Sequence, residues 1–342
     1  MTTPIDNVQE LSAFQGQLRA LGYRTVEQVL GASRSAPKPM ARYLGLDDQK
    51  LAALQATLRQ KVPPVAAFFG AAAHPMARRL GVRLDFIPRR ASVAMAFSAS
   101  VAAPLPPKVS LIDKMRPVRN QANRGTCVAH ASLAVVEHYW GTQNIVVDLS
   151  RQFAYWDCKQ HDGHLEEEGT WIGVAMSLLK SDGCPEENVW PYVPDDIPGN
   201  EGQGPASGSA LAGAAQFRIP GFRQLAPNSV RDVKAELADG HPVAFSIPVF
   251  DSWHSTFVNP EVEHSGDIPN PIPNEIANGG HAMCLVGYED SNDDPAAGGG
   301  RFLLRNSWGT TWASGSSTGI PGYGTISYSY IAAYAMEAFS IR

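Results

Sequence analysis

Apolar residues recur at three- and four-residue spacing near the start of the chain. Between residues 8 and 24 this spacing is kept by four side chains, Leu11, Phe14, Leu18 and Leu21. The stretches TVEQVLGAS and DQKLAALQATLRQKV repeat the spacing, and such periodicity predicts amphipathic helices. We therefore expect a small, all-helical N-terminal domain over residues 1–65.

Two stretches within this region also look alike. LGYRTVEQVL begins at Leu21 and LGLDDQKLAAL begins at Leu44, and both consist of Leu-Gly-apolar, a short polar step and a helical pattern. The repeat weakly resembles tandem helix-hairpin-helix modules. An ordinary small helical bundle is the alternative, and both interpretations stay open.

Prolines mark the region that follows. Pro104, Pro106 and Pro107 fall close together in SASVAAPLPPKVS, and proline both stops helices and stiffens an extended chain. Residues 66–109 are therefore expected to form a linker or an inhibitory segment. A second domain is then expected over residues 110–342.

The second domain shows helical patterns first and strand patterns afterwards. Helices are expected over residues 127–140, 169–183 and 229–240. Strands are expected where β-rich, alternating stretches are bounded by Gly, Pro or Asn, over residues 241–250, 280–290, 301–308 and 322–331. A helical half followed by a strand half predicts an α+β domain with a cleft between the halves.

One cysteine stands where a helix is expected to begin. In NQANRGTC the turn is polar and contains Gly125, and the apolar helix starts at Cys127. Unpaired N–H groups and the helix dipole favour an anion there, so they lower the pKa of a thiol. The Gln121 side-chain amide and the Cys127 N–H can then donate to an oxyanion, and Gly125 lets the backbone approach a substrate carbonyl.

A base and a group that holds it are found further along the chain. His281 opens a strand directly after two glycines, so its ring should face an uncrowded space. An imidazole needs an acceptor on one nitrogen to fix its tautomer, and Asn306, at the end of the next strand, can supply an amide oxygen. Trp308 is expected to cover this hydrogen bond. Together these residues predict nucleophilic catalysis by Cys127 with His281 as its base.

The blocks QANRGTC, GGHAMCLVGYED, LLRNSWGTTW and GYGTISYSYI resemble those of papain-family (C1-type) cysteine peptidases, in the same chain order. His281 lies 154 residues after Cys127, and Asn306 lies 179 residues after it. The likeness covers about residues 110–342. It implies a two-lobed fold with a helical lobe, a β-barrel-like lobe and a cleft between them. It also implies an endopeptidase that hydrolyses peptide bonds through a thioester acyl-enzyme without a cofactor.

The resemblance implies a set of residues that bind substrate, namely Gly125, Gly169, Thr170, Ile172, Gly280, Ala282 and Trp308. The chain departs from the family pattern in two places. Arg-Gly-Thr-Cys lacks the second cysteine that the family carries, and Val128 stands where the family has an aromatic residue. The Gly-Gly ledge that the family uses to hold substrate is replaced by Gly169-Thr170, so one glycine is missing.

Charge is unevenly distributed along the chain. Residues 1–107 hold 13 Lys/Arg and 6 Asp/Glu, whereas residues 108–342 hold 15 Lys/Arg and 27 Asp/Glu. The two parts should therefore attract each other. Our leading hypothesis is autoinhibition, in which the N-terminal region docks over the cleft or threads through it as a pro-region. Recognition of a partner or target is the alternative role for residues 1–107.

The four cysteines are Cys127, Cys158, Cys184 and Cys284. They include no C-x-x-C pair, so neither a disulfide scaffold nor a zinc site is expected. Free thiols are favoured, although one Cys158–Cys184 bridge stays open. HDGHLEEEG, at residues 161–169, could hold a metal but is better explained as a solvated loop. No membrane span and no secretory leader are recognised, so we expect a cytoplasmic protein or one exported by a leaderless route.

Three functions remain open. The first is a cysteine endopeptidase acting on protein or peptide substrates. The second is a papain-like deamidase or acyltransferase acting on protein side chains, because a thioester accepts nucleophiles other than water. The third is a binding module with an idle site and a basic N-terminal domain, for which nucleic acid is not the expected partner. Cut peptide bonds, or ammonia released from an intact chain, would discriminate the first two.

Overall fold

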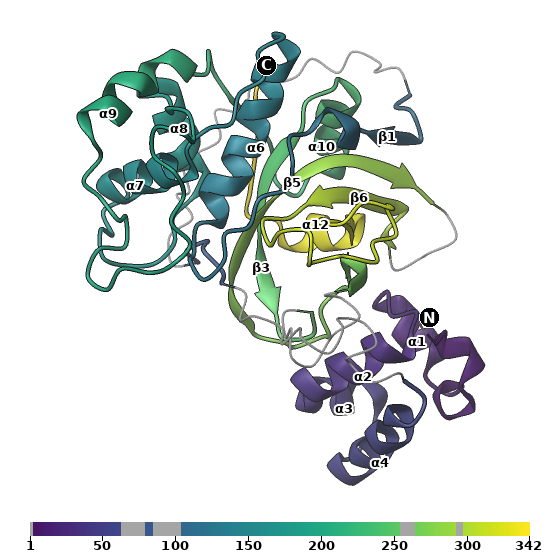
Figure 1. Cartoon of the computed structure of the whole chain (residues 1–342). Helices are drawn as coiled ribbons and strands as arrows, with labels where there is room; N and C mark the ends of the chain where they lie inside the picture. The colour runs from purple at the N-terminus through teal and green to yellow at the C-terminus, as the bar shows by residue number, and fades with distance from the viewer. Residues whose placement is uncertain (1–2, 63–78, 85–103, 254–263, 292–296) are drawn as a thin grey trace.

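The computed structural model describes residues 3–62, 79–84, 104–253, 264–291 and 297–342. It contains a group of N-terminal helices and a larger, two-lobed part, each with its own hydrophobic core. The N-terminal helices lie beside the sheet of the larger part and away from its helical lobe (Figure 1). The predicted α+β fold with an all-helical N-terminal region is confirmed.

Residues 3–62 form short helices. They are η1 (Ile5–Asn7), η2 (Gln9–Leu11), α1 (Gln15–Ala20), α2 (Val26–Ser35), α3 (Pro37–Leu44) and α4 (Asp48–Arg59). Gly22, between α1 and α2, and Gly45, between α3 and α4, have left-handed φ angles of 83° and 68°. Thr25 and Asp47 then cap α2 and α4 by accepting a hydrogen bond from the backbone three residues on. Each copy of the repeat thus forms a turn and the helix that follows it, α2 in the first copy and α4 in the second.

The N-terminal helices dock on a loop of the sheet lobe. Asn270 donates its N–H to the Leu21 carbonyl at 3.0 Å, at the turn between α1 and α2. Ile272 is only 1% exposed and belongs to the core of the N-terminal helices. Tyr23 is fully buried at the same junction. Burial raises the pKa of its phenol, and the nearby charge of Glu275 raises it further. One side chain of the sheet lobe therefore completes the small helical core.

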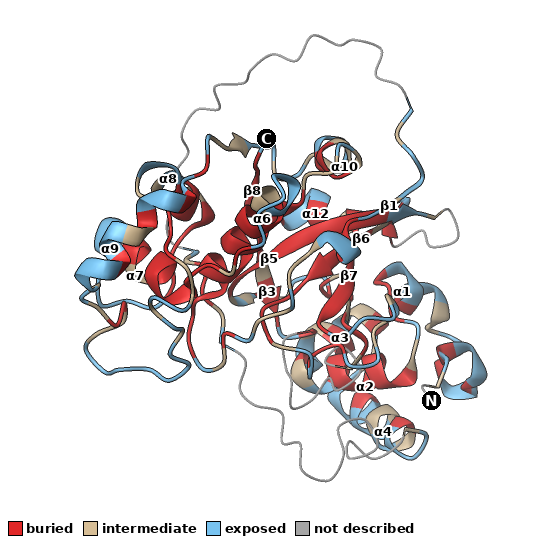
Figure 2. Ribbon diagram, turned by 45° about the horizontal axis from the view of Figure 1, so that its top comes forward, coloured by how far each residue is buried: buried red, intermediate tan, exposed pale blue. Residues whose placement is uncertain are grey.

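In the part of the chain that the structure describes, the helical lobe contains four α-helices. These are α6 (Cys127–Thr142), α7 (Arg151–His161), α8 (Ile172–Ser181) and α9 (Gly208–Ala214). The lobe continues into η4 (Ala215–Phe217), and η3 (Ile112–Lys114) precedes it in the chain. Helix α6 is buried along most of its length, because it lies between the other helices and the sheet (Figure 2).

The second lobe is built on a sheet of eight strands among the described residues. The strands are β1 (Lys108–Ser110), β2 (Arg223–Gln224), β3 (Val243–Phe250), β4 (Asp267–Ile268), β5 (Ala277–Asp290), β6 (Gly300–Arg305), β7 (Tyr323–Ser327) and β8 (Glu337–Ser340). Their order is β2-β8-β3-β5-β6-β7-β4, with β1 paired to β5. All pairs are antiparallel except β4 with β7. Helices α10 (Val230–Ala238) and α12 (Tyr328–Tyr334) also belong to this lobe.

One predicted strand is only half correct. The strand expected over residues 322–331 ends at Ser327, and the next residues form helix α12. The Ser327 hydroxyl accepts a hydrogen bond from the Tyr330 N–H, which caps that helix. The alternation of Tyr328 and Tyr330 imitated a strand and hid this cap, whereas Ile331 is buried three residues after Tyr328, at helical spacing.

Helix α6 packs directly on β3 and β5, so one hydrophobic core spans both lobes. This packing brings the first residue of α6 against the first half of β5. The N-terminus of α6 therefore lies where the two lobes meet, at the place where the cleft was expected. Among the described residues, no helix has both the length and the apolar character needed to cross a membrane.

Candidate active site

Cys127 is the first residue of α6 and is completely buried. Its Sγ accepts a hydrogen bond from the Ala282 N–H at 3.4 Å, so helix α6 and strand β5 meet at the sulfur. Burial raises the pKa of the thiol to about 12. The backbone N–H groups of Ala282, Gly81 and Val128 act in the opposite direction, because each favours the thiolate.

His281 precedes Ala282 on β5 and is held by an amide. Its Nε2–H donates to Asn306 Oδ1 at 2.8 Å, and Asn306 directly follows β6. The Trp308 ring stacks on the imidazole with a centroid distance of 4.6 Å and an interplanar angle of 28°. Trp308 is 1% exposed, so it shields the His281–Asn306 hydrogen bond from water. This is the arrangement that the sequence predicted for the three residues.

Gln121 is fixed in the turn before Cys127. Its Oε1 accepts a hydrogen bond from the Ser307 hydroxyl at 2.5 Å, and its backbone N–H donates to the Ser307 carbonyl at 2.7 Å. The side-chain Nε2 therefore points the other way, and it donates to the carbonyls of Arg124 at 2.8 Å and Arg79 at 3.0 Å. The amide predicted to hold an oxyanion thus holds a carbonyl from residues 79–84.

Residues 79–84 lie as an extended segment between the two lobes; we call it the cleft segment. On the helical side it pairs with Thr170, whose N–H donates to the Gly81 carbonyl at 3.1 Å. On the sheet side the Val82 N–H donates to the Gly280 carbonyl at 3.0 Å. The cleft segment therefore satisfies backbone groups of both walls, as a bound peptide would.

Glycines allow the cleft segment to approach the walls closely. A Cβ atom on Gly81 would lie 1.9 Å from the Gly125 carbonyl oxygen, and one on Gly169 would lie 2.9 Å from the Gly81 oxygen. A Cβ on Gly280 would lie 2.8 Å from the Val82 oxygen. These contacts leave no space for side chains at the glycines, so the backbones pack directly against each other.

The predicted substrate-binding residues thus divide into two groups. Gly125, Gly169, Thr170 and Gly280 contact the cleft segment, Ala282 contacts the sulfur and Trp308 contacts the imidazole. Ile172 differs, because it is fully buried in the core at the start of α8. Its N–H donates to a carboxylate oxygen of Glu337 at 3.1 Å, and the Gly173 N–H donates to the same carboxylate at 2.9 Å.

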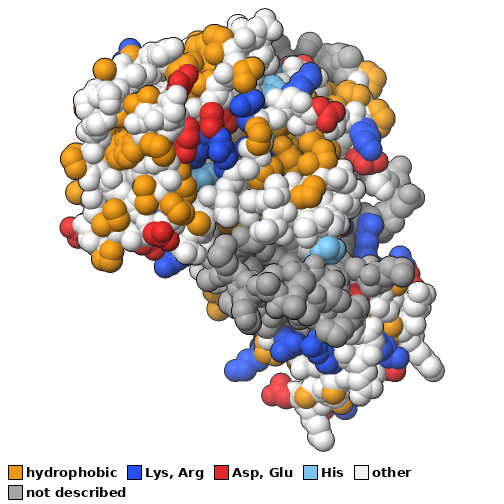
Figure 3. All heavy atoms as spheres, viewed as in Figure 1, with side chains coloured by type: hydrophobic (Ala, Val, Ile, Leu, Met, Phe, Trp, Pro, Cys, Tyr) orange, Lys and Arg blue, Asp and Glu red, His pale blue; other side chains and the backbone are white. Residues whose placement is uncertain are grey.

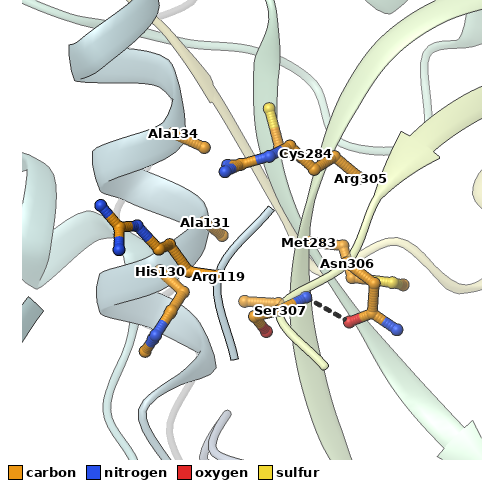
Figure 4. Close-up of a pocket in the computed structure, with 10 residues that line it drawn as sticks. Arg119, His130, Ala131, Ala134, Met283, Cys284, Arg305, Asn306 and Ser307 are labelled. Atoms are coloured by element: carbon orange, nitrogen blue, oxygen red, sulfur yellow. Dashed lines mark hydrogen bonds between the residues drawn. The ribbon is translucent and has the colours of Figure 1, made fainter. Parts of the chain in front are cut away.

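A small cavity lies behind the cleft, between α6 and the sheet (Figure 4). It is lined by Arg119, His130, Ala131, Ala134, Ala282, Met283, Cys284, Arg305, Asn306 and Ser307. Burial lowers the pKa of His130 to about 3 and raises the pKa of Cys284 to about 12. Both side chains are therefore neutral near pH 7.

Both histidines of the acidic loop at residues 161–169 lie next to a carboxylate, one on α7 and one within the loop. His161 Nδ1 lies 3.3 Å from Asp157 Oδ1, and His164 Nδ1 lies 3.0 Å from Glu167 Oε1. Among the residues that the structure describes, no three His, Cys, Asp or Glu side chains are grouped to hold a metal. All four cysteines are free thiols, so the bridge left open between Cys158 and Cys184 is not formed.

Sequence reasoning missed the residues that occupy the cleft. Arg79, Gly81 and Val82 carry no local motif, although a glycine between two spaced arginines in a basic region is a signal that could have been noticed. Ser307 was also missed. Its place directly after Asn306 is visible in the sequence, but its hydrogen bond to Gln121 depends on the fold.

A thiol at a helix N-terminus, an imidazole held by an amide and a side-chain amide in the turn before the thiol define a site of the cysteine-peptidase class. Residues 106–329 match the family model described as "Papain family cysteine protease". The chain belongs to this family, as the four sequence blocks predicted.

Relatives of known sequence agree with this assignment. The chain is 25% identical over 234 residues to "Uncharacterized peptidase C1-like protein L477" of Acanthamoeba polyphaga mimivirus, covering 67% of each protein. It is 29% identical over 201 residues to cathepsin J of Mus musculus, covering 57% of this chain and 54% of the mouse protein. The chain thus spans about half the length of the mouse relative.

Solved structures show the same architecture. Xylellain, a cysteine protease from Xylella fastidiosa, matches with a TM-score of 0.65 and 26% identity, covering 79% of this chain and 98% of xylellain. Procathepsin L2 from Tenebrio molitor matches with a TM-score of 0.51 and 22% identity over 70% of this chain and 69% of that one. The second likeness shows the fold alone. The predicted papain-like, two-lobed fold is confirmed.

Proposed function

We propose that this chain is a cysteine endopeptidase whose cleft segment holds it in a blocked state. The Cys127 thiolate would attack the scissile carbonyl carbon of a peptide. Gln121 Nε2 and the Cys127 N–H would stabilise the resulting oxyanion, and Asn306 would orient His281. The His281 imidazolium then protonates the leaving amine as the C–N bond breaks. Water activated by His281 hydrolyses the thioester and restores the thiol.

The proposed catalysis rests on one observation, which is that helix α6 and strand β5 are in contact at the Cys127 sulfur. Cys127 Sγ accepts the Ala282 N–H, and the neighbouring His281 is held by Asn306. The Gln121 amide already binds a carbonyl of the cleft segment, that of Arg79, and the Gly81 N–H of the same segment faces the sulfur. A substrate carbonyl in that position would be polarised by the same donor.

Peptide hydrolysis tests this proposal when it is measured on the whole chain and on three variants. We expect Cys127→Ser to remove activity, and His281→Ala to lower kcat/KM by about 10² to 10⁴, the usual effect of losing a general acid–base. Asn306→Ala should lower activity less, because the imidazole remains. The products are identified by mass spectrometry. Release of ammonia without any cut bond would instead favour the deamidase alternative.

The observation that carries the blocked state is that the cleft segment uses the groups a substrate needs. It occupies the Gln121 amide and the backbone groups of Thr170 and Gly280. The charge pattern supports such docking, and Figure 3 shows more Lys and Arg than Asp and Glu on the visible face of the N-terminal helices. We therefore propose that the N-terminal region of the chain docks on the peptidase part of the same chain.

Gly81→Val tests the block. A Cβ at Gly81 would meet the Gly125 carbonyl oxygen, and Gly125 is the less movable of the two because it precedes the buried start of α6. The cleft segment should therefore withdraw, and peptide hydrolysis should rise at least several-fold. Gly16→Val is the matched control, since Gly16 lies on α1 with open space around its Cβ position. Equal rates for Gly81→Val and the unaltered chain would contradict the block.

We further propose that the protein works in a reducing compartment such as the cytoplasm. The four free thiols support this proposal, because oxidising compartments favour disulfides. Thiol titration of the denatured protein without reductant should detect all four cysteines. Detection of two would indicate a disulfide and oppose the proposal.

A further inference from the structure

The helical wall of the cleft is lined by carboxylates where the cleft segment places arginines. Arg79 Nη1 lies 3.2 Å from Glu168 Oε2, and its Nη2 lies 3.6 Å from Asp196 Oδ2. Arg83 Nη1 lies 2.6 Å from Glu167 Oε2. Two cations of one short segment thus meet the acidic loop before α8, and one of them also meets Asp196.

The Glu168 carboxylate lies close to Cys127. A Cβ on Gly125 would lie 2.4 Å from Glu168 Cγ and 2.8 Å from its Oε1, so the side chain covers the turn just before Cys127. Its charge is close enough to raise the pKa of the Cys127 thiol. The Glu168 carboxylate therefore lies beside the position where a scissile carbonyl would be attacked.

Arg79 connects this carboxylate to the oxyanion donor. Its carbonyl accepts from Gln121 Nε2, while its guanidinium pairs with Glu168 and Asp196. A substrate residue that runs in the same chain direction as the cleft segment, and whose carbonyl replaces that of Arg79, would have its own side chain within reach of the same two carboxylates. The reach of a long basic side chain matches the site, because Arg79 itself spans it.

The carboxylates of Glu168 and Asp196 lose their positively charged partner, Arg79, when the cleft segment withdraws. Burial raises the pKa of Glu168, Arg79 lowers it, and the neighbouring Glu201 and Asp196 raise it again. Without Arg79 the repulsion among these three acids is no longer offset. A positively charged substrate side chain would restore the balance, whereas an acidic one would increase the repulsion.

We infer that Glu168, assisted by Asp196, is a specificity-determining residue that selects peptides with Arg or Lys at the residue whose carbonyl Cys127 attacks. This inference rests on the proposed endopeptidase activity and goes beyond it by naming the substrate class. The pair is partly open to water, since 34% of the Glu168 side chain is exposed. We therefore expect a preference of about ten-fold, between that of an exposed ion pair and that of a buried charged hydrogen bond.

The test uses the full-length chain and a set of otherwise identical peptides that carry Arg, Lys, citrulline, Gln or Glu at the attacked residue. Citrulline is the key comparison, because it keeps the shape of arginine and removes its charge. The measured quantity is the ratio of kcat/KM between two peptides. This ratio is independent of the fraction of molecules in which the cleft is open.

Three variants complete the design. Glu168→Gln should bring the arginine-to-citrulline ratio close to one, and Glu168→Lys should make the glutamate peptide better than the arginine peptide. Glu166→Gln is the matched control, because Glu166 is an exposed acid on the same loop, and the ratio should stay near ten. Circular dichroism of each variant checks that the chain has folded.

The outcomes separate this inference from the proposal beneath it. A protein that cleaves the arginine and citrulline peptides equally well overturns the inference and leaves the endopeptidase proposal standing. If Glu168→Gln still prefers the arginine peptide over the citrulline peptide, another residue selects the substrate. That result overturns the role of Glu168. A protein that cleaves none of the peptides, even in Gly81→Val, overturns both proposals.

Discussion

At the scale of single residues, the reactivity of Cys127 depends on what covers it. A helix N-terminus lowers the pKa of a thiol, whereas loss of water raises it, and in the closed cleft the loss of water dominates. The Gly81 N–H offsets only part of this effect. The same sulfur can therefore be inert beneath the cleft segment and nucleophilic after the segment has withdrawn.

The pH dependence of alkylation follows from this. A raised pKa means that the protonated thiol persists to high pH, so the rate at Cys127 in the unaltered chain should rise about ten-fold per pH unit from pH 6 to 10 without a plateau. In Gly81→Val the plateau should appear at lower pH, because water and the nearby His281 then support the thiolate. Iodoacetamide labelling followed by peptide mass spectrometry measures both profiles. Superimposable profiles would show that the cleft segment does not control the thiol.

The sequence identified those residues whose position follows from local patterns. Cys127 begins a helix, His281 lies on a strand and Asn306 directly follows one, so each could be placed from its own block and then brought together by the family resemblance. Arg79 and Gly81 could not be found in this way. Their contacts with Gln121 and Gly125 join parts of the chain that share no pattern and meet only through tertiary packing.

At the scale of elements, helix α8 obtains its N-terminal cap from the other lobe. Trp171 is its N-cap residue and makes no side-chain cap hydrogen bond. Glu337 on β8 supplies the acceptors instead, because its carboxylate receives the N–H groups of Ile172 and Gly173. The Ser246 hydroxyl on β3 donates to it as well, at 3.2 Å. Periodicity predicted the helix but could not reveal a cap that comes from a distant strand.

Removing this cap should weaken the union of the two lobes. Glu337→Ala leaves two helix N–H groups and a buried hydroxyl without their acceptor, so we expect the free energy of unfolding to fall by about 1–3 kcal/mol. Glu337→Gln keeps one oxygen and should cost less. Urea unfolding followed by tryptophan fluorescence measures the difference. Glu289→Ala removes an exposed acid paired with Lys108 and should change stability by less than about 1 kcal/mol. An equal, small effect of both alanine variants would contradict the capping role.

At the scale of the whole molecule, the chain is attached to the sheet lobe at two places, one before the cleft segment and one after it. We call these two places anchors. Before the cleft, the helices of residues 3–62 hold the sheet lobe through Leu21, Asn270 and Ile272. After it, the Pro107 carbonyl accepts the Asp290 N–H at 2.8 Å, and β1 then joins β5. Anchors on both sides raise the effective concentration of the cleft segment, so a modest set of hydrogen bonds can keep the cleft occupied.

Loosening the first anchor should therefore open the cleft without touching it. Ile272→Ala removes a buried side chain from the core of the N-terminal helices, a change that costs about 2–5 kcal/mol in a packed core. We expect residues 15–59 to exchange amide hydrogens faster and basal peptide hydrolysis to rise several-fold. Combined with Gly81→Val, the same change should add little, because the cleft is already open. Ile320→Ala is the control, since Ile320 is partly exposed on the sheet lobe.

The combination of variants decides between two views of the N-terminal helices. If they act only by holding the cleft segment, then Ile272→Ala and Gly81→Val share one effect, and their gains in kcat/KM do not multiply. Faster amide exchange with unchanged hydrolysis would mean that the cleft segment stays bound through its own contacts. The helices would then be free to serve the alternative role of recognising a partner, and the block would depend on residues 79–84 alone.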